Sequence, residues 1–111
     1  MPLPPLDDAA RARARDRALA ARRLRAEWKA RLASGDADLD GLLTASADEP
    51  ALAGMRVADA LGALPGVGPR AVARILEACD IAPTRRLRGL GVRQRAALVA
   101  PDGPVAPRAG R

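Results

Sequence analysis

The sequence has no histidine, no tyrosine and no phenylalanine, and it has one cysteine, Cys79, and one tryptophan, Trp28. Without histidine, neither a Ser-His-Asp nor a Cys-His catalytic arrangement can form, and imidazole ligands for metals are excluded. A single cysteine cannot form an internal disulfide, which agrees with a reducing compartment. One aromatic residue does not make a stacking platform for single-stranded bases, so the composition favours recognition of a duplex or of shape.

Features of membrane and secreted proteins are also missing. The sequence has no run of roughly 18 apolar residues that could span a bilayer. Residues 1–10 lack the basic start, the apolar stretch and the small-residue cleavage site of a secretion signal. We therefore expect a cytoplasmic protein. Its 111 residues are expected to form one domain at most, with a modest core.

Positive charge is in excess, and it lies in two blocks. The net charge is +6. Residues 1–35 carry nine basic and four acidic groups, and residues 65–100 carry seven basic and two acidic groups. Between them, residues 36–64 carry one basic and six acidic groups. Such basic blocks indicate a polyanionic partner, either nucleic acid or an anionic membrane surface, and the alternative is an ordinary solvated surface.

The residue content predicts an all-α fold. Alanine and leucine supply 42 of the 111 residues, whereas the β-branched residues number ten, so helix is favoured over strand. Residues 8–33 predict one long helix, capped by Asp7 or Asp8 and ended by Ser34-Gly35. Its second half has an apolar stripe at helical spacing, formed by Ala20, Ala21, Leu24, Trp28 and Leu32.

The first half of this long helix has a different character. Residues 11–17, Arg-Ala-Arg-Ala-Arg-Asp-Arg, contain no large apolar side chain that could pack. We expect this half to project as a basic arm whose helical structure depends on propensity alone. In the second half, Trp28 is expected to anchor the helix in the core, with base intercalation as the alternative.

Shorter helices are predicted over residues 38–46, 48–54, 56–64, 69–79 and 92–99. Asp38 and Asp48 are expected to cap the first two of them. The helix over 69–79 has one apolar face, formed by Val72, Ile75, Leu76 and Cys79. Cys79 is therefore expected to be a buried core residue and not a reactive thiol. The inward face of the helix over 92–99 is predicted to consist of Val92, Ala96 and Val99.

Residues 36–41, Asp-Ala-Asp-Leu-Asp-Gly, match the opening of a calcium-binding loop, D-x-D-x-D-G. Such a loop requires a glutamate at its twelfth position. That position is Ala47 here, and Pro50 follows too soon for the exit helix. We predict no metal site, and we expect these acids to cap a helix and to face solvent.

The segment over residues 64–75, Leu-Pro-Gly-Val-Gly-Pro-Arg-Ala-Val-Ala-Arg-Ile, is typical of a helix-hairpin-helix motif. Gly66 and Gly68 permit a sharp turn and a close approach to another surface, and Val67 can fill the core beneath. The N–H groups that begin the second helix can hold a phosphate oxygen, and Arg70 adds a charge. The alternative is a plain turn between helices with glycine caps.

The segment over residues 81–95 is dense in arginine. A cluster surrounds Leu87, which together with Leu90 is expected to anchor the segment to the core. The cluster consists of Arg85, Arg86 and Arg88, followed on the next helix by Arg93 and Arg95. Arginine forks bind phosphate through two hydrogen bonds and enter narrow minor grooves. The alternative is a surface on which these arginines pair with the acidic block over 36–49.

Several segments together resemble the family of actinobacterial integration host factors. The resemblance covers roughly residues 1–100 and is carried by residues 2–6, 21–27, 64–68 and, most specifically, 81–91, Ile-Ala-Pro-Thr-Arg-Arg-Leu-Arg-Gly-Leu-Gly. It implies an S13-like helix-two-turn-helix domain in a nucleoid-associated protein. Such proteins bind duplex DNA with little sequence preference, organise or bend the chromosome and assist recombination. They share a name, but not a fold, with the heterodimeric factor of other bacteria.

The predicted organisation is a basic helical arm over residues 1–35, a DNA-binding domain over 36–100 and a disordered tail over 101–111. The resemblance assigns the family's arginine cluster to Arg85, Arg86 and Arg88, and its phosphate-binding turn to Gly66, Val67 and Gly68. Arg70 and Arg93 join the predicted DNA-binding residues. Duplex DNA is the expected partner, with the recombination machinery as a second one, in the cytoplasm and nucleoid. No cofactor, metal or small-molecule substrate is predicted.

Two other functions remain as alternatives. One is a structured-RNA or ribosome-associated protein, because the same helix-two-turn-helix occurs in a small-subunit ribosomal protein; only the resemblance separates the two. The other is a base-excision glycosylase, which resembles the chain at the hairpin alone. Such enzymes need a base-flipping pocket with a catalytic Asp and often a Lys. Lys29 is the one lysine and is far from the hairpin in sequence, so no enzyme is predicted.

Overall fold

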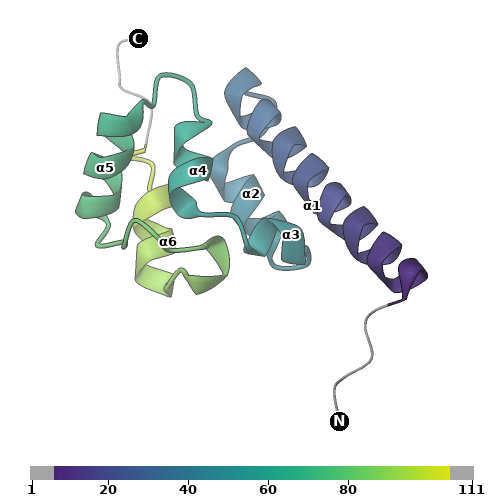
Figure 1. Ribbon diagram of the computed structural model, residues 1–111. Helices are drawn as coiled ribbons and strands as arrows, with labels where there is room; N and C mark the ends of the chain where they lie inside the picture. The colour runs from purple at the N-terminus through teal and green to yellow at the C-terminus, as the bar shows by residue number, and fades with distance from the viewer. Residues whose placement is uncertain (1–6, 106–111) are drawn as a thin grey trace.

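The computed structural model describes residues 7–105, and every regular element in that range is helical apart from one isolated β-bridge. The predicted all-α class is therefore confirmed. In chain order the elements are α1 (Asp8–Ser34), α2 (Leu39–Ser46), α3 (Pro50–Ala53), α4 (Val57–Gly62), α5 (Pro69–Ala78), the 3-10 helix η1 (Leu87–Gly89) and α6 (Val92–Val99). The 27 residues of α1 span about 40 Å, and the other helices form a compact group beside it (Figure 1).

Both ends of α1 follow from local chemistry. The Asp7 carboxylate accepts a hydrogen bond from the N–H of Ala10 at 2.6 Å, which caps the first turn. Gly35 ends the helix with a left-handed φ of 85°, a conformation that glycine adopts at little cost. The predicted cap by an aspartate and the predicted stop at Ser34-Gly35 are confirmed.

The second half of α1 packs on the domain. Leu32 is 1% exposed, and Leu24 and Trp28 lie partly buried against the core. The guanidinium of Arg31 covers the Trp28 ring at 4.3 Å from its centroid. Trp28 thus anchors the helix at the edge of the core and not at its centre.

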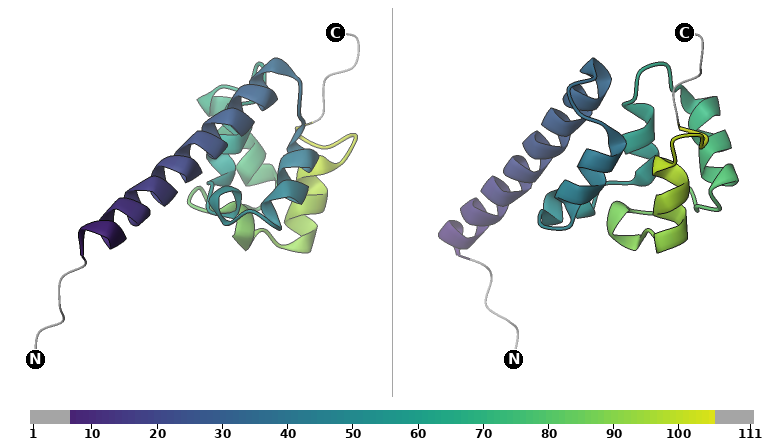
Figure 2. Two further views of the ribbon diagram at one scale, coloured as in Figure 1. Left: turned by 90° about the vertical axis from the view of Figure 1, so that its right-hand side faces the viewer. Right: turned by 180° about the vertical axis from the view of Figure 1, so that it is seen from behind.

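The first half of α1 has the exposure that a projecting arm requires. Residues 13–20 are all exposed, including Leu19 at 39%. Figure 2 shows this part of the helix extending past the other elements. Leu32, near the end of α1, belongs to the core of the compact domain. The projecting arm is therefore only the first half of α1.

The core lies where the end of α1 meets α2 to α6. Its most deeply buried large side chains are Leu32, Leu42, Leu52, Val57, Leu61 and Leu98, each under 2% exposed. No polar or charged side chain of residues 7–105 is buried. Each of these apolar side chains contributes about 1.5–3 kcal/mol by leaving water, so a leucine-rich core stabilises the domain without phenylalanine or tyrosine.

Two details of the short helices differ from the predictions. In α6 the buried residue is Leu98, whereas Val92 is 87% exposed and Ala96 is exposed. The prediction that Val92 and Ala96 face inward was wrong, because an eight-residue helix whose apolar residues lie on several sides does not fix its own buried face. In α3 the N-cap is Glu49 and not Asp48, and the N–H groups that begin the helix have no side-chain cap.

Cys79 lies in the core, 6% exposed, as the sequence predicts. Burial raises the pKa of its thiol, which lowers the fraction of reactive thiolate at any given pH. We expect a chromogenic disulfide reagent at pH 8 to label Cys79 roughly 100-fold more slowly in the folded protein than in denaturant, because the thiol must first be exposed. Absorbance kinetics measure this, and equal rates in the two conditions would show that the thiol is accessible.

The chain directly after α6 still packs on the domain. Residues 101–105 form turns, and Val105 packs against the core. The rest of the predicted tail, residues 106–111, and the opening residues 1–6 lie outside the described part of the chain. No helix within residues 7–105 is long and apolar enough to cross a bilayer.

Candidate nucleic-acid interface

An isolated antiparallel β-bridge holds the arginine segment in place. Arg86 lies opposite Arg56, the residue that precedes α4. Two backbone hydrogen bonds of 2.9 Å flank this pair, from Val57 N–H to Arg85 C=O and from Leu87 N–H to Met55 C=O. Leu87 and Met55 are both buried. A segment with little regular structure is therefore fixed to the core at both sides of the bridge.

Two of the three guanidinium groups of the cluster donate hydrogen bonds to backbone carbonyl groups. Arg85 donates a hydrogen bond to the carbonyl of Gly89 at 3.0 Å, and Arg86 donates one to the carbonyl of Gly54. The Nη1 atom of Arg88 also comes near Gly54, at 3.5 Å from the place where a Cβ would stand. All three side chains are exposed. Arg85 and Arg86 thus combine exposure with a position held by a hydrogen bond, as the sequence predicts.

These arginines have no acidic partner among residues 7–105. The ion pairs in that range are Arg11–Asp8 at 3.6 Å and Arg95–Asp40 at 3.3 Å. Arg95 also donates to the hydroxyl of Thr44 at 3.2 Å. Pairing with the acidic block therefore holds for Arg95. It does not hold for the cluster or for Arg93, whose side chain is exposed.

A short turn joins α4 to α5 where the sequence has its helix-hairpin-helix pattern. Gly66 has a left-handed φ of 73°, and Val67 packs partly buried against the core beneath the turn. Gly68 is the N-cap of α5, with Pro69 in the first turn and no side chain capping the helix. Within residues 7–105 no side chain caps the first N–H groups of α5, which are thus available to an acceptor, and Arg70 is exposed beside them.

The two glycines of the turn serve different needs. Gly66 has the positive φ that favours glycine, whereas Gly68 is extended, with φ −89° and ψ −178°. A Cβ at Gly68 would meet nothing within 4 Å. The fold therefore does not require glycine at 68, and any need for it there must come from a surface that approaches from outside.

The structure does not bring the hairpin and the arginine cluster together. Arg56 precedes the first residue of α4, and the hairpin follows its last turn. In Figure 1 the α4–α5 turn is at the top, whereas the segment before α6 is at the bottom, the side toward which the first half of α1 also extends. The predicted residues thus form two surfaces at opposite ends of the domain.

The arginine cluster has a basic neighbour that the sequence did not single out. Arg56 is exposed and lies beside the cluster only because the bridge joins it to Arg86. One signal was available, since Arg56 is the single basic residue in the acidic block over 36–64.

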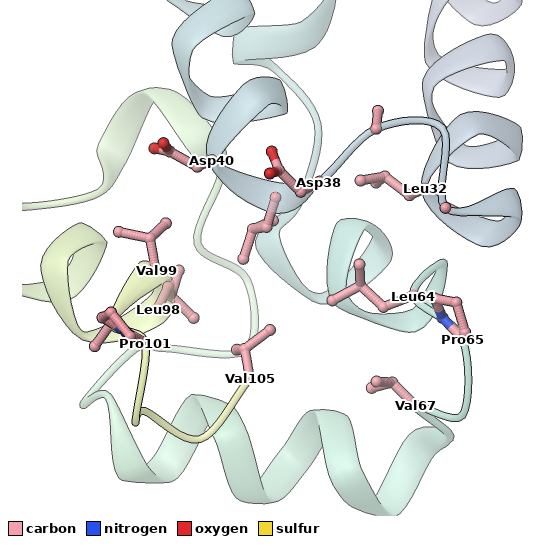
Figure 3. Close-up of a pocket in the computed structure, with 14 residues that line it drawn as sticks. Leu32, Asp38, Asp40, Leu64, Pro65, Val67, Leu98, Val99, Pro101 and Val105 are labelled. Carbon is pink, nitrogen blue, oxygen red and sulfur yellow. The ribbon is translucent and has the colours of Figure 1, made fainter. Parts of the chain in front are cut away.

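A hollow beside the hairpin is lined by two aspartates, and both already interact with other residues of the chain. It has a volume of about 530 Å³ and mostly apolar walls, with Asp38 and Asp40 drawn at one side (Figure 3). Asp38 accepts a hydrogen bond from the N–H of Gly41 at 2.7 Å and caps α2, as predicted. Asp40 pairs with Arg95. No group of three or more acidic or thiol side chains that could hold a metal occurs within residues 7–105.

Comparisons with known proteins agree with this architecture. Residues 32–101 match the model of the S13-like H2TH domain. The chain is 50% identical over 99 residues to an integration host factor of Mycolicibacterium smegmatis, across 89% of this chain and 94% of that protein. It is 48% identical to an integration host factor of Mycobacterium tuberculosis over the same shares. It is 42% identical to one of Streptomyces coelicolor, across 88% of this chain and 92% of that protein.

A solved structure gives the same fold. The structure of sIHF bound to an 8 bp palindromic DNA matches with a TM-score of 0.73 at 40% sequence identity. The match covers 75% of this chain and 93% of that chain. The predicted combination of a long helix and an S13-like domain is thereby confirmed.

Proposed function

Because the chain belongs to the integration host factor family found in mycobacteria and Streptomyces, we propose that it is a nucleoid-associated protein that binds duplex DNA and organises or bends the chromosome. One observation carries the proposal: exposed arginines are held in position by backbone hydrogen bonds and have no acidic partner in residues 7–105. Such a cluster is suited to a polyanion, and the similar solved structure contains DNA.

We assign the contacts with phosphate to the two surfaces. At the hairpin they are Gly66, Val67, Gly68 and Arg70, and at the cluster they are Arg85, Arg86, Arg88 and Arg93. Contacts with phosphate and sugar fix the position of a protein on DNA but carry no direct sequence information. Low sequence preference follows from this assignment, and a place in the cytoplasm and nucleoid, with the recombination machinery as a further partner, completes the proposal.

The alternatives have less support. Structured RNA is not favoured, since the relatives are named integration host factors and the similar structure is bound to DNA. The relatives are not named as enzymes, and we propose no catalytic role for this chain.

Fluorescence anisotropy with a labelled duplex tests the proposal. We expect the logarithm of the binding constant to fall linearly with the logarithm of the salt concentration, with a slope of about −0.9 for each phosphate contact. Unlabelled duplex should displace the labelled DNA at lower concentration than structured RNA of equal length. Stronger displacement by the RNA would favour the RNA-binding alternative, and no binding at low salt would exclude both.

The basic arm gives a separate prediction. Residues 10–17 have good helix formers but bury no large apolar side chain, so we expect their amides to exchange rapidly in the free protein. On DNA, phosphates neutralise the arginines and the same amides should exchange at least about tenfold more slowly. Residues 24–32 of the same helix are the internal control, because they pack on the domain and should be protected in both states. Slow exchange over 10–17 without DNA would contradict the prediction.

A further inference from the structure

Arg56 occupies a position where its charge is unfavourable in the free protein. It is the N-cap residue of α4, with φ −72° and ψ 141°, and its side chain makes no capping hydrogen bond. The start of a helix is the positive end of its dipole, where a cation is disfavoured. Serine, threonine, asparagine or aspartate at an N-cap would accept a hydrogen bond from the first turn. Arginine provides no such acceptor.

The β-bridge adds a second unfavourable interaction. The hydrogen bonds flank the Arg56–Arg86 pair and do not join the two residues to each other. This is the more closely spaced type of antiparallel pair, with Cα atoms typically about 4.5 Å apart and both side chains on one face. Like charges directly opposite each other in this way are destabilising. The guanidinium of Arg86 is held nearby by the carbonyl of Gly54.

No acid in residues 7–105 forms an ion pair with either arginine. The ion pairs there involve Arg11 and Arg95. Asp59 lies in the first turn of α4, three positions after Arg56, but forms no ion pair with it. Arg56 and Arg86 are both exposed. The two residues therefore lie opposite each other in the bridge, and both side chains are accessible and without a negative partner among the described side chains.

We propose that Arg56 is a phosphate-binding residue and that, together with Arg86, it clamps the backbone of duplex DNA from the two sides of the bridge. The proposal rests on the proposed function. A phosphate placed between the guanidinium groups would convert the repulsion into two charge-assisted interactions. Arg56 then lowers the stability of the free protein and raises the affinity for DNA. A purely structural residue would instead raise the stability of the free protein.

Two variants of Arg56 test the proposal. Arg56→Gln removes the charge and keeps much of the length, whereas Arg56→Ser also supplies a capping hydroxyl to α4. We expect both to bind a labelled duplex roughly threefold to tenfold more weakly and to reduce the salt slope by about 0.9. At low salt, the Tm of the free protein should rise by about 1–4 °C for Arg56→Gln and by several degrees more for Arg56→Ser.

Arg23→Gln is the matched control. Arg23 is exposed on α1, two positions from Arg25, whose Nη1 atom reaches the carbonyl of Ala51 at 3.5 Å. Two positions correspond to about 200° of rotation, so Arg23 faces away from α3. This variant loses the same charge and should change the affinity less than the Arg56 variants do.

The outcomes separate the inference from the proposed function. If the wild-type protein does not bind duplex DNA, the proposed function fails. If the wild type binds and Arg86→Ala weakens it, but both Arg56 variants bind like Arg23→Gln, this inference alone is overturned. A loss of affinity accompanied by a fall in Tm would indicate a structural role for Arg56 and would also overturn it.

Discussion

Replacing Arg85, Arg86 and Arg88 by alanine is expected to lower the affinity for duplex DNA on the order of 100-fold while the protein stays folded. The substitutions leave Leu87 in the core and leave both backbone hydrogen bonds of the bridge intact. The lost side-chain hydrogen bonds are exposed, so their removal costs little stability. The fold therefore does not depend on these side chains, although their position depends on the fold.

Affinity measured at several salt concentrations on two unrelated duplexes gives the mechanism of the loss. Each phosphate contact that disappears should reduce the salt slope by about 0.9. A similar loss on both duplexes would indicate contacts with the backbone. A larger loss on A/T-rich DNA would indicate that an arginine enters the narrow minor groove.

The triple lysine variant is the matched control for this experiment. It retains three positive charges at the same positions but lacks the guanidinium fork. We expect it to keep most of the salt slope and to lose only part of the affinity. If the triple alanine variant shows a native circular dichroism spectrum, native affinity and an unaltered salt slope, the cluster is not part of the binding surface.

The Gly68→Glu variant is expected to bind duplex DNA at least about tenfold more weakly without loss of the fold. The backbone of Gly68 is extended and a Cβ there meets nothing within 4 Å, so the side chain can be accommodated in the free protein. A carboxylate near the start of α5 interacts favourably with the helix dipole. It would also occupy the place proposed for a phosphate and repel it, so affinity and stability should change in opposite directions.

Gly68→Gln and Gly68→Ala separate the effect of charge from that of bulk. Glutamine has nearly the same size as glutamate, so a smaller loss for Gly68→Gln would assign the difference to repulsion of phosphate. Alanine tests the need for a close approach of the backbone. Thermal unfolding by circular dichroism accompanies each binding curve. A folded Gly68→Glu protein with unchanged affinity would remove the hairpin from the DNA-binding surface.

Local chemistry let the sequence alone determine the fold class and most helix ends. The cap at Asp7, the stop at Gly35 and the start of α5 at Pro69 depend on contacts within a few residues, which a sequence displays directly. The sequence also predicted that Leu87 is buried, because it is a large apolar side chain surrounded by arginines. The short helices were predicted less well, because the buried face of α6 is chosen by the packing of Leu98 and not by the helix itself.

Only the tertiary structure decided which basic groups share a surface. Arg56 and Arg86 are far apart in sequence, and they meet because Met55 and Leu87 are buried in one core and the backbones between them form a bridge. The hairpin follows α4 directly but lies at the other end of the domain from the bridge. No local pattern encodes such pairing, since it results from how separate helices fill a common core. The sequence determined the chemistry of the basic groups, and packing determined their arrangement.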